Sequence, residues 1–566
     1  MRRLAGPLLL GFAFGAGVFW SWQQWPDPQI DYGRELYFPW RICEGDVLYR
    51  DLAHFNGPLS QYLNALLFRL CGAHVLTLSL ANLVVLAGVL VLVWRLVRRL
   101  ADRLTATVAG LAVLGMFAFG QHMLCGNFNW VSPYSHEITH GIALGLLALH
   151  LVLRGSLAAS GFVLGLVFLT KPEVFLAAAA GVATTLGARL RTGGGGRDLL
   201  PVAAGALIAP LLACCLLATA MPWADALTGT CGGLWHLGNA ELRALPFYAQ
   251  VSGANRIAEN LTWMAGWSWR WVVVGTVAAL ACWLPGGRWL APAAAAGLLW
   301  LAPPAWIYVV RPLPFLLPLV ALGWGLVLWR RPTPRAVAGL GLVVFSGVLL
   351  LKIALNTSVQ HYGFALALPG TVLWVATLCG TLPGLVTRWR GDGRGLAWAG
   401  ALVFLVTAAG VVHMTQTRFF AHKEHALGIG PNRIVTDARG PVLAQALSRI
   451  RTQYPRDATV VVLPEGVTLN FYLRQRNPTP FVNFMPPELI LFGEARMVAA
   501  LERSPPDLVV LLHKWTSEYG VPRFGVDFGQ SLRAFVDRNY ERAQRIGAEP
   551  FLSEMAYGVE IWRRRP

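Results

Sequence analysis

Apolar runs of membrane-spanning length recur along the chain almost to position 416, and short polar gaps separate them. The hydrocarbon core of a bilayer is about 30 Å thick, so a helix needs about 20 mostly apolar residues to cross it. We read spans at 4–22, 74–94, 104–124, 138–153, 157–170, 173–189, 199–221, 269–285, 289–307, 313–329, 336–356, 362–386 and 396–415. The pattern predicts a polytopic α-helical membrane protein with about 13 transmembrane helices.

Residues 417–566 have a different pattern, in which short apolar runs alternate with charged stretches of helical periodicity. Short apolar runs bounded by Pro are typical of buried strands. We read "ATVVVLP", "PDLVVLLH" and "MAYGVEIWRR" as strands and "TLNFYLRQR" and "EARMVAALERS" as helices. The chain therefore divides into a transmembrane domain, 1–416, and a small water-facing α/β domain, 417–566.

Composition and charge agree with this division. The 566 residues are 55% hydrophobic, above the roughly 45–50% apolar share, Gly included, of soluble domains. The net charge of +18 does not indicate nucleic-acid binding, because the basic residues cluster in gaps between apolar runs. The clusters are Arg95, Arg98, Arg99 and Arg103; Arg189, Arg191 and Arg197; Arg330, Arg331 and Arg335; and Arg388, Arg390 and Arg394. With these clusters and Arg2-Arg3 in the cytoplasm, an odd number of spans places the C-terminal domain outside.

The first outer loop, 23–73, concentrates ions in an apolar chain. Residues 1–416 hold fourteen carboxylates, and six of them lie in this loop: Asp27, Asp31, Glu35, Glu44, Asp46 and Asp51. A solvated loop is the simplest explanation. However, Asp31 and Glu35 are four residues apart and share a helix face, with Arg34 beside them. A carboxylate next to an arginine stays ionised and can accept a proton.

Other outer segments supply complementary groups, so cations and acids are expected to converge at one membrane face. They are Tyr134, His136, Glu137, Lys171, Glu173, Arg311, Lys352, His361 and Tyr362. Each also has a structural alternative: Lys171 and Glu173 pair across Pro172, Arg311 and Lys352 extend to the interface, and the histidines hold hydrogen bonds.

Motifs for other chemistries are missing from the sequence. We find no Walker A, GxGxxG after a strand or GxSxG elbow, so ATP, dinucleotide and serine-hydrolase functions have little support. No cofactor or metal is indicated, although a divalent cation would be compatible with the acids.

The segments "DYGRELYFPWRICEGDVLYRDL" and "HYGFALALPG" resemble those of GT-C glycosyltransferases. The family 39 type, with the protein O-mannosyltransferases and the lipid A aminoarabinose transferase, is the most similar. The resemblance covers 1–416 and implies a polyprenyl-phosphate sugar donor, a hydroxyl acceptor on protein, lipid or glycan, and a site on the periplasmic face of a bacterial inner membrane.

The same resemblance implies roles for individual residues. Asp31 takes the place of the family's first-loop aspartate, which acts on the acceptor. The sequence reads Asp-Tyr-Gly-Arg-Glu where many members have adjacent Asp-Glu, so Glu35 is the candidate second acid or orienting group. The candidate contacts to the donor phosphate are Arg34, Lys171, Arg311 and Lys352.

Two functions of other classes stay open at this point. A transporter or lipid flippase would carry ionisable residues near span centres and repeated halves, and neither pattern is visible. A non-catalytic sensor with a periplasmic domain would leave the ion cluster of the first loop unexplained.

Overall fold

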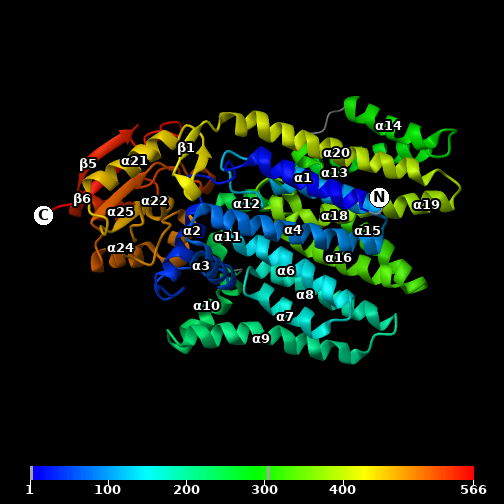
Figure 1. Ribbon diagram of the computed structural model, residues 1–566, viewed down its shortest axis with the longest axis horizontal. Helices are drawn as coiled ribbons and strands as arrows, with labels where there is room; N and C mark the ends of the chain where they lie inside the picture. Colours follow the sequence, from blue (N-terminus) through cyan, green and yellow to red (C-terminus); the bar gives the residue numbers. More distant parts are fainter. Residues whose placement is uncertain (1–3, 237, 302–305) are drawn as a thin grey trace.

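The computed structural model describes residues 4–236, 238–301 and 306–566. It is elongated, with a long helical bundle and a small sheet-containing domain at one end (Figure 1). The helices of the bundle are α1 (Ala5–Ser21), α4 (Val75–Leu100), α5 (Arg103–Val113), α6 (His136–Leu153), α7 (Leu157–Phe168), α8 (Pro172–Leu190), α9 (Leu199–Ala218), α13 (Ile257–Ala281), α14 (Gly287–Leu301), α15 (Leu313–Arg330), α16 (Pro334–Leu350), α17 (Gly363–Leu366), α18 (Leu368–Ala376), α19 (Leu382–Arg388) and α20 (Gly393–Arg418).

Eight helical segments of the described chain are long and apolar enough to cross a membrane. They are Val75–Leu100, His136–Leu153, Pro172–Leu190, Gly196–Ala218, Leu313–Arg330, Pro334–Asn356, Gly363–Arg388 and Gly393–His422. Three shorter apolar helices, Ala5–Ser21, Arg103–Ala118 and Leu157–Phe168, accompany them. The prediction of a polytopic helical membrane protein with a small C-terminal α/β domain is confirmed. The count of thirteen spans stays a prediction, and part of the span at 289–307 and Arg2-Arg3 lie outside the described residues.

Several of the arginine clusters meet at the end of the bundle opposite the sheet domain. The Arg99 guanidinium donates to the Leu153 carbonyl at 3.2 Å, and that of Arg189 donates to the Val152 carbonyl at 2.9 Å. Arg191 similarly donates to the carbonyl of Trp329. These contacts join three of the short gaps, as the charge pattern predicts. Which side of a membrane this end faces stays a prediction.

Short helices cover the other end of the bundle, beside the sheet domain (Figure 1). They are α2 (Tyr32–Cys43), α3 (Leu59–Cys71), α10 (Trp223–His236), α11 (Ala240–Ala244) and α12 (Pro246–Ser252). The first outer loop therefore folds into helices that lie between the bundle and the C-terminal domain.

The C-terminal domain is built on a four-stranded sheet of order β3-β4-β6-β5. Its elements are β1 (His425–Leu427), β2 (Ile434–Thr436), α21 (Gly440–Gln453), β3 (Val460–Leu463), α22 (Thr468–Leu473), α23 (Pro486–Phe492), α24 (Glu494–Arg503), β4 (Leu508–Leu512), α25 (Gln530–Asn539), β5 (Tyr540–Gly547) and β6 (Gly558–Arg564). Strands β3 and β4 are parallel and buried throughout, which explains their continuous apolar sequence. The three strands and two helices that we read from the sequence are confirmed.

The first loop and the C-terminal domain share one hydrophobic core. Leu36 and Phe38 of α2 pack in a cluster with Val460 and Val462 of β3 and Phe471 of α22. Because α2 approaches α22 closely, a side chain at position 33 would collide with the backbone of Thr468, so this position is glycine. The loop and the tail thus fold as one unit, although they are hundreds of residues apart in the sequence.

A buried ion pair fixes this joint. The carboxylate of Asp27, which is 2% exposed, accepts from the guanidinium of Arg439 in the C-terminal domain at 2.6 Å. It also accepts from the backbone N–H groups of Gln29 and Ile30. Asp27 is therefore engaged in holding the structure and is not available for chemistry.

Candidate active site

Asp31 stands at the start of α2 with an unusual backbone. Its φ is +56°, a value that non-glycine residues adopt mainly at strained or functional positions. Its N–H donates to Oε1 of Glu465 in the C-terminal domain at 3.0 Å. In the described part of the chain, its carboxylate has neither a hydrogen bond nor an ion pair. Burial raises the pKa of Asp31 to about 6, although the charges of Arg34 and Lys514 oppose the shift.

Glu35 is used differently from Asp31. It is fully buried, and its carboxylate accepts from the backbone N–H of His136 at 3.1 Å and lies 2.6 Å from Nδ1 of the same residue. Nε2 of His136 lies 2.9 Å from the amide nitrogen of Asn82. A neutral imidazole with its proton on Nδ1 satisfies both contacts. This arrangement matches the structural alternative for His136 and makes Glu35 an anchor that fixes α2 against α6.

Glu137 lies in the same buried network. The side-chain amide of Gln61 donates to Glu137 at 2.9 Å and to Glu35 at 3.3 Å, so one amide bridges two carboxylates. The hydroxyl of Ser135 also donates to Glu137, and the imidazole of His54 lies 3.3 Å from it. The network occupies both acids with protein partners, in contrast to Asp31.

Three of the four predicted phosphate-binding cations gather around Tyr134. The Arg34 guanidinium donates to its carbonyl at 3.2 Å, and the Lys171 ammonium donates to its hydroxyl at 2.9 Å. The ring of Tyr134 packs against that of Tyr362 at 5.3 Å, and the Lys352 ammonium lies 4.4 Å from the Tyr362 ring centre. These residues come from α2, three loops and the short turn after α16, so the predicted convergence at one end of the bundle is observed.

Lys352 and Glu173 form an ion pair of 2.7 Å. The pairing predicted for Glu173 with Lys171 across Pro172 is therefore taken instead by a lysine 179 residues away. Lys171 is left with the Tyr134 hydroxyl as its hydrogen-bond acceptor among the described residues. It is 6% exposed, so its charge is held in a largely dry place where it lacks a paired carboxylate.

Arg311 lies in a different cluster. Its guanidinium donates to the side chain of Asn260 at 2.7 Å and packs over the rings of Tyr308 and Trp263. None of its described contacts is with Asp31, Arg34 or Lys171, so the structure does not bring it together with the other candidates.

His361 closes the aromatic side of the cluster. Its ring packs against Phe128 at 4.6 Å and Phe247 at 5.0 Å, and it has a positive φ of 51°. Phe247 in turn contacts Tyr519 of the C-terminal domain at 5.1 Å. The outer loop that carries α12 and the C-terminal domain therefore both reach this region.

The C-terminal domain contributes charged groups that we did not predict. Glu465 follows β3 and Lys514 follows β4, and the ends of adjacent parallel strands lie side by side. Glu465 is 4% exposed, and burial, together with the charge of Asp31, raises its pKa to about 8. Burial also raises the pKa of Glu488 in α23 to about 7. A charged residue at the second position after each buried strand was the sequence signal that could have identified this edge.

The arrangement suits acid–base chemistry on a phosphate-bearing substrate. Arg34 lies beside Asp31, whose carboxylate is unpaired among the described residues, and Glu35 and Glu173 pair with Arg34 and Lys352. Within residues 4–236, 238–301 and 306–566, no group of three or more His, Cys, Asp or Glu side chains could hold a metal ion.

Fold and site thus define a polytopic membrane protein with a charged site between its bundle and its C-terminal domain. No protein-family model matches the chain, and no curated protein matches it. Among solved structures, the oligosaccharyltransferase of Archaeoglobus fulgidus with a tethered acceptor peptide is 13% identical, with 90% of this chain and 69% of that chain covered and a TM-score of 0.47. ArnT from Cupriavidus metallidurans bound to undecaprenyl phosphate is 15% identical, with 99% and 98% covered and a TM-score of 0.46.

At identities this low, similarity of arrangement does not transfer an activity, so the function has to be argued from the site.

Proposed function

We propose that the protein is an inverting glycosyltransferase of the GT-C type. It moves a hexosyl or pentosyl group from a polyprenyl-phosphate donor to a hydroxyl of a glycan, lipid or protein acceptor, at the periplasmic face of a bacterial inner membrane. The observation that carries this proposal is the carboxylate of Asp31, which is unpaired among the described residues and lies next to Arg34, a cation that shares Tyr134 with Lys171. A donor with a long apolar tail also explains why the site lies at the end of a membrane bundle.

Each step of the transfer has a group to perform it. Asp31 accepts the proton of the acceptor hydroxyl as its oxygen attacks the anomeric carbon. The bond between that carbon and the phosphate oxygen breaks, and the phosphate leaves with the electron pair. Arg34, Lys171 and Lys352 stabilise the charge that develops on the phosphate. A single displacement inverts the anomeric carbon.

The pKa of Asp31 fits this role. A general base works best when its pKa lies near the working pH, because it is then both ionised and basic. An ordinary aspartate has a pKa near 3.9, whereas burial raises that of Asp31 to about 6. Glu35, which is fully buried and bound to His136, orients α2 and is not free to take a proton.

The test compares Asp31→Asn with Glu35→Gln in the purified full-length protein. Asp31→Asn keeps the size of the side chain and removes the base, so transfer should fall by about 10²–10⁴-fold while binding of a polyprenyl-phosphate sugar is kept. Glu35→Gln should lower transfer together with thermal stability, because it disturbs a buried network. Near-normal transfer by Asp31→Asn at matched expression would reject the proposal, and a larger loss in Glu35→Gln with unchanged stability would exchange the two roles.

A further inference from the structure

A charged cavity lies at the opposite end of α2 from Asp31. It has a volume of about 810 Å³ and is lined by residues of α2 and α3, the start of α4 and the C-terminal domain. Small-molecule sites have volumes of about 300–1,000 Å³, so the cavity is large enough for one ligand of sugar or lipid-headgroup size. None of the residues of the candidate active site lines it.

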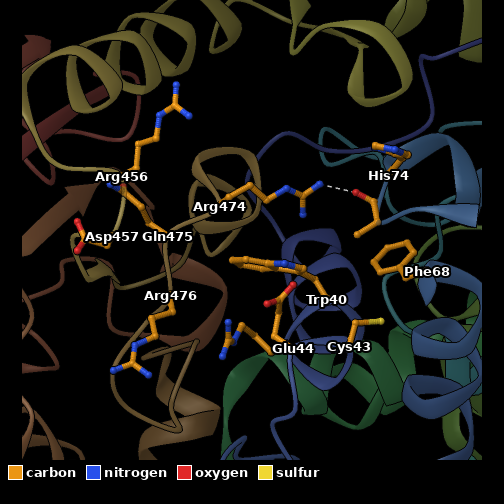
Figure 2. A pocket seen from close by; sticks show the side chains of 12 residues that line it. Trp40, Cys43, Glu44, Phe68, His74, Arg456, Asp457, Arg474, Gln475 and Arg476 are labelled. Atoms are coloured by element: carbon orange, nitrogen blue, oxygen red, sulfur yellow. Dashed lines mark hydrogen bonds between the residues drawn. The ribbon is translucent and has the colours of Figure 1, made fainter.

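Four arginines line this pocket, which we call the arginine pocket: Arg41, Arg456, Arg474 and Arg476. Figure 2 shows Arg474 reaching across the pocket above the ring of Trp40. The guanidinium of Arg474 lies 5.3 Å from the centre of that ring and 4.1 Å from that of Phe471, and it donates to the carbonyl of Ala73. Arg474 is therefore held in place by aromatic rings and a carbonyl, and no carboxylate of the described residues forms an ion pair with it.

The remaining charges leave the pocket positive. Arg41 pairs with Asp46 at 2.8 Å. Arg456 and Arg476 have no ion pair and no side-chain hydrogen bond to any group in the described parts of the chain. The lining contains two carboxylates, Glu44 and Asp457, against the four guanidinium groups. A pocket with this balance favours an anion, and planar guanidinium groups match the oxygens of a phosphate.

The pocket also lies beside the membrane part of the chain. Its lining includes Ala73 and His74, and His74 directly precedes the apolar helix α4. Asn432 of the C-terminal domain accepts from the N–H of Val75, which fixes the first turn of α4 against that domain. A group bound here would therefore sit at the level where phosphate headgroups of a bilayer end.

We propose that the arginine pocket binds a phosphate-bearing group of sugar or headgroup size. The group is carried by an anionic lipid of the surrounding membrane or by a free sugar phosphate. The site bridges the C-terminal ends of α2 and α22. Asp31 directly precedes α2 and Glu465 lies in the loop before α22, so the occupant ties the first loop to the C-terminal domain. The inference rests on this cavity alone and is independent of the proposed transferase activity.

The experiment measures binding to the full-length protein in nanodiscs. Inorganic phosphate and glucose 1-phosphate are titrated by calorimetry into protein in phosphatidylcholine nanodiscs. In a second arm, nanodiscs with a minor fraction of phosphatidylglycerol are analysed by mass spectrometry for retention of that lipid on the protein. The test variant is Arg456→Gln/Arg476→Gln, because both side chains are exposed and lack protein partners, so the protein should keep its fold. Arg449→Gln, an exposed arginine outside the pocket, is the matched control.

We expect binding of at least one probe by the wild type, at least about tenfold weaker binding by the double glutamine variant, and no change in Arg449→Gln. Arg456→Lys/Arg476→Lys should keep part of the affinity, and high salt should lower it. Binding of the soluble probes identifies a free phosphate source, whereas retention of phosphatidylglycerol alone identifies a lipid source. No binding of any probe by a folded wild type, or equal binding by the double glutamine variant, would overturn the proposal.

Discussion

Acid should switch off transfer with a midpoint near pH 6, because the carboxylate of Asp31 has to be ionised to act as a base. Burial raises its pKa to about 6, so about nine-tenths of the protein carries the ionised base at pH 7 and about one-tenth at pH 5. The rate should therefore fall roughly tenfold between these values. An aspartate with an ordinary pKa near 3.9 would still be more than nine-tenths ionised at pH 5 and would give a nearly flat profile.

The assay is kcat/KM for transfer from a synthetic polyprenyl-phosphate sugar between pH 4.5 and 8, in detergent, with donor binding checked at both ends. Glu465→Gln serves as the control. Below pH 8 Glu465 is mostly neutral, since burial and the charge of Asp31 raise its pKa to about 8, and a glutamine oxygen can still accept from the N–H of Asp31. The acid limb should therefore stay near pH 6 in this variant. A wild-type profile that is flat down to pH 5, with intact donor binding, would refute the assignment of Asp31 as a buried base.

Two further predictions concern the ion pair between Asp27 and Arg439 and the ammonium group of Lys171. Arg439→Gln should lower the free energy of unfolding by about 3 kcal/mol, because it leaves the buried Asp27 carboxylate unpaired. Thermal unfolding in detergent measures this loss, and the double variant Asp27→Asn/Arg439→Gln should recover part of it. A loss in Arg439→Gln no larger than that in Arg449→Gln would contradict the prediction. Lys171→Gln should raise KM for the donor by about tenfold, since a charge-assisted contact to phosphate is lost. Arg311→Gln, the control, should change this KM little. A larger increase of KM in Arg311→Gln than in Lys171→Gln would show that the cluster around Tyr134 does not hold the phosphate.

Much of the fold was predictable because single segments determine it. The helix α4 has a long, mostly apolar sequence, and β3 and β4 are runs of Val and Leu that only a doubly covered strand would bury. Boundaries were less predictable where a helix continues out of the apolar region. The predicted span 269–285 begins twelve residues later than α13, because "IAENLTWMAGWS" continues the same helix with polar and aromatic residues. Hydropathy records the apolar part of such a helix and not its full length.

The candidate site was predictable to the extent that membrane topology gathers its residues. Arg34, Lys171 and Lys352 were expected at the same end of the bundle, and the structure places them around two tyrosines. The contribution of Glu465 was not predicted, because it depends on the docking of a separate domain onto α2. Likewise, the partner of Glu173 depends on how α8 and α16 pack, and sequence spacing alone favoured the nearer lysine.

The packing also explains why so apolar a chain concentrates acids in its first loop. Three acids at and before the start of α2 are spaced by four residues, at 27, 31 and 35. The structure gives them different surroundings. Asp27 is neutralised by Arg439 of the C-terminal domain, whereas Glu35 pairs with Arg34 of α2 and is oriented by His136 of the bundle. These two buried anchors hold the segment at both ends, which stabilises the positive φ of Asp31 between them. Packing on both sides offsets the strain of the positive φ at Asp31. Of the three acids, Asp31 is the one whose carboxylate has no partner among the described residues, and it lies where the two domains meet.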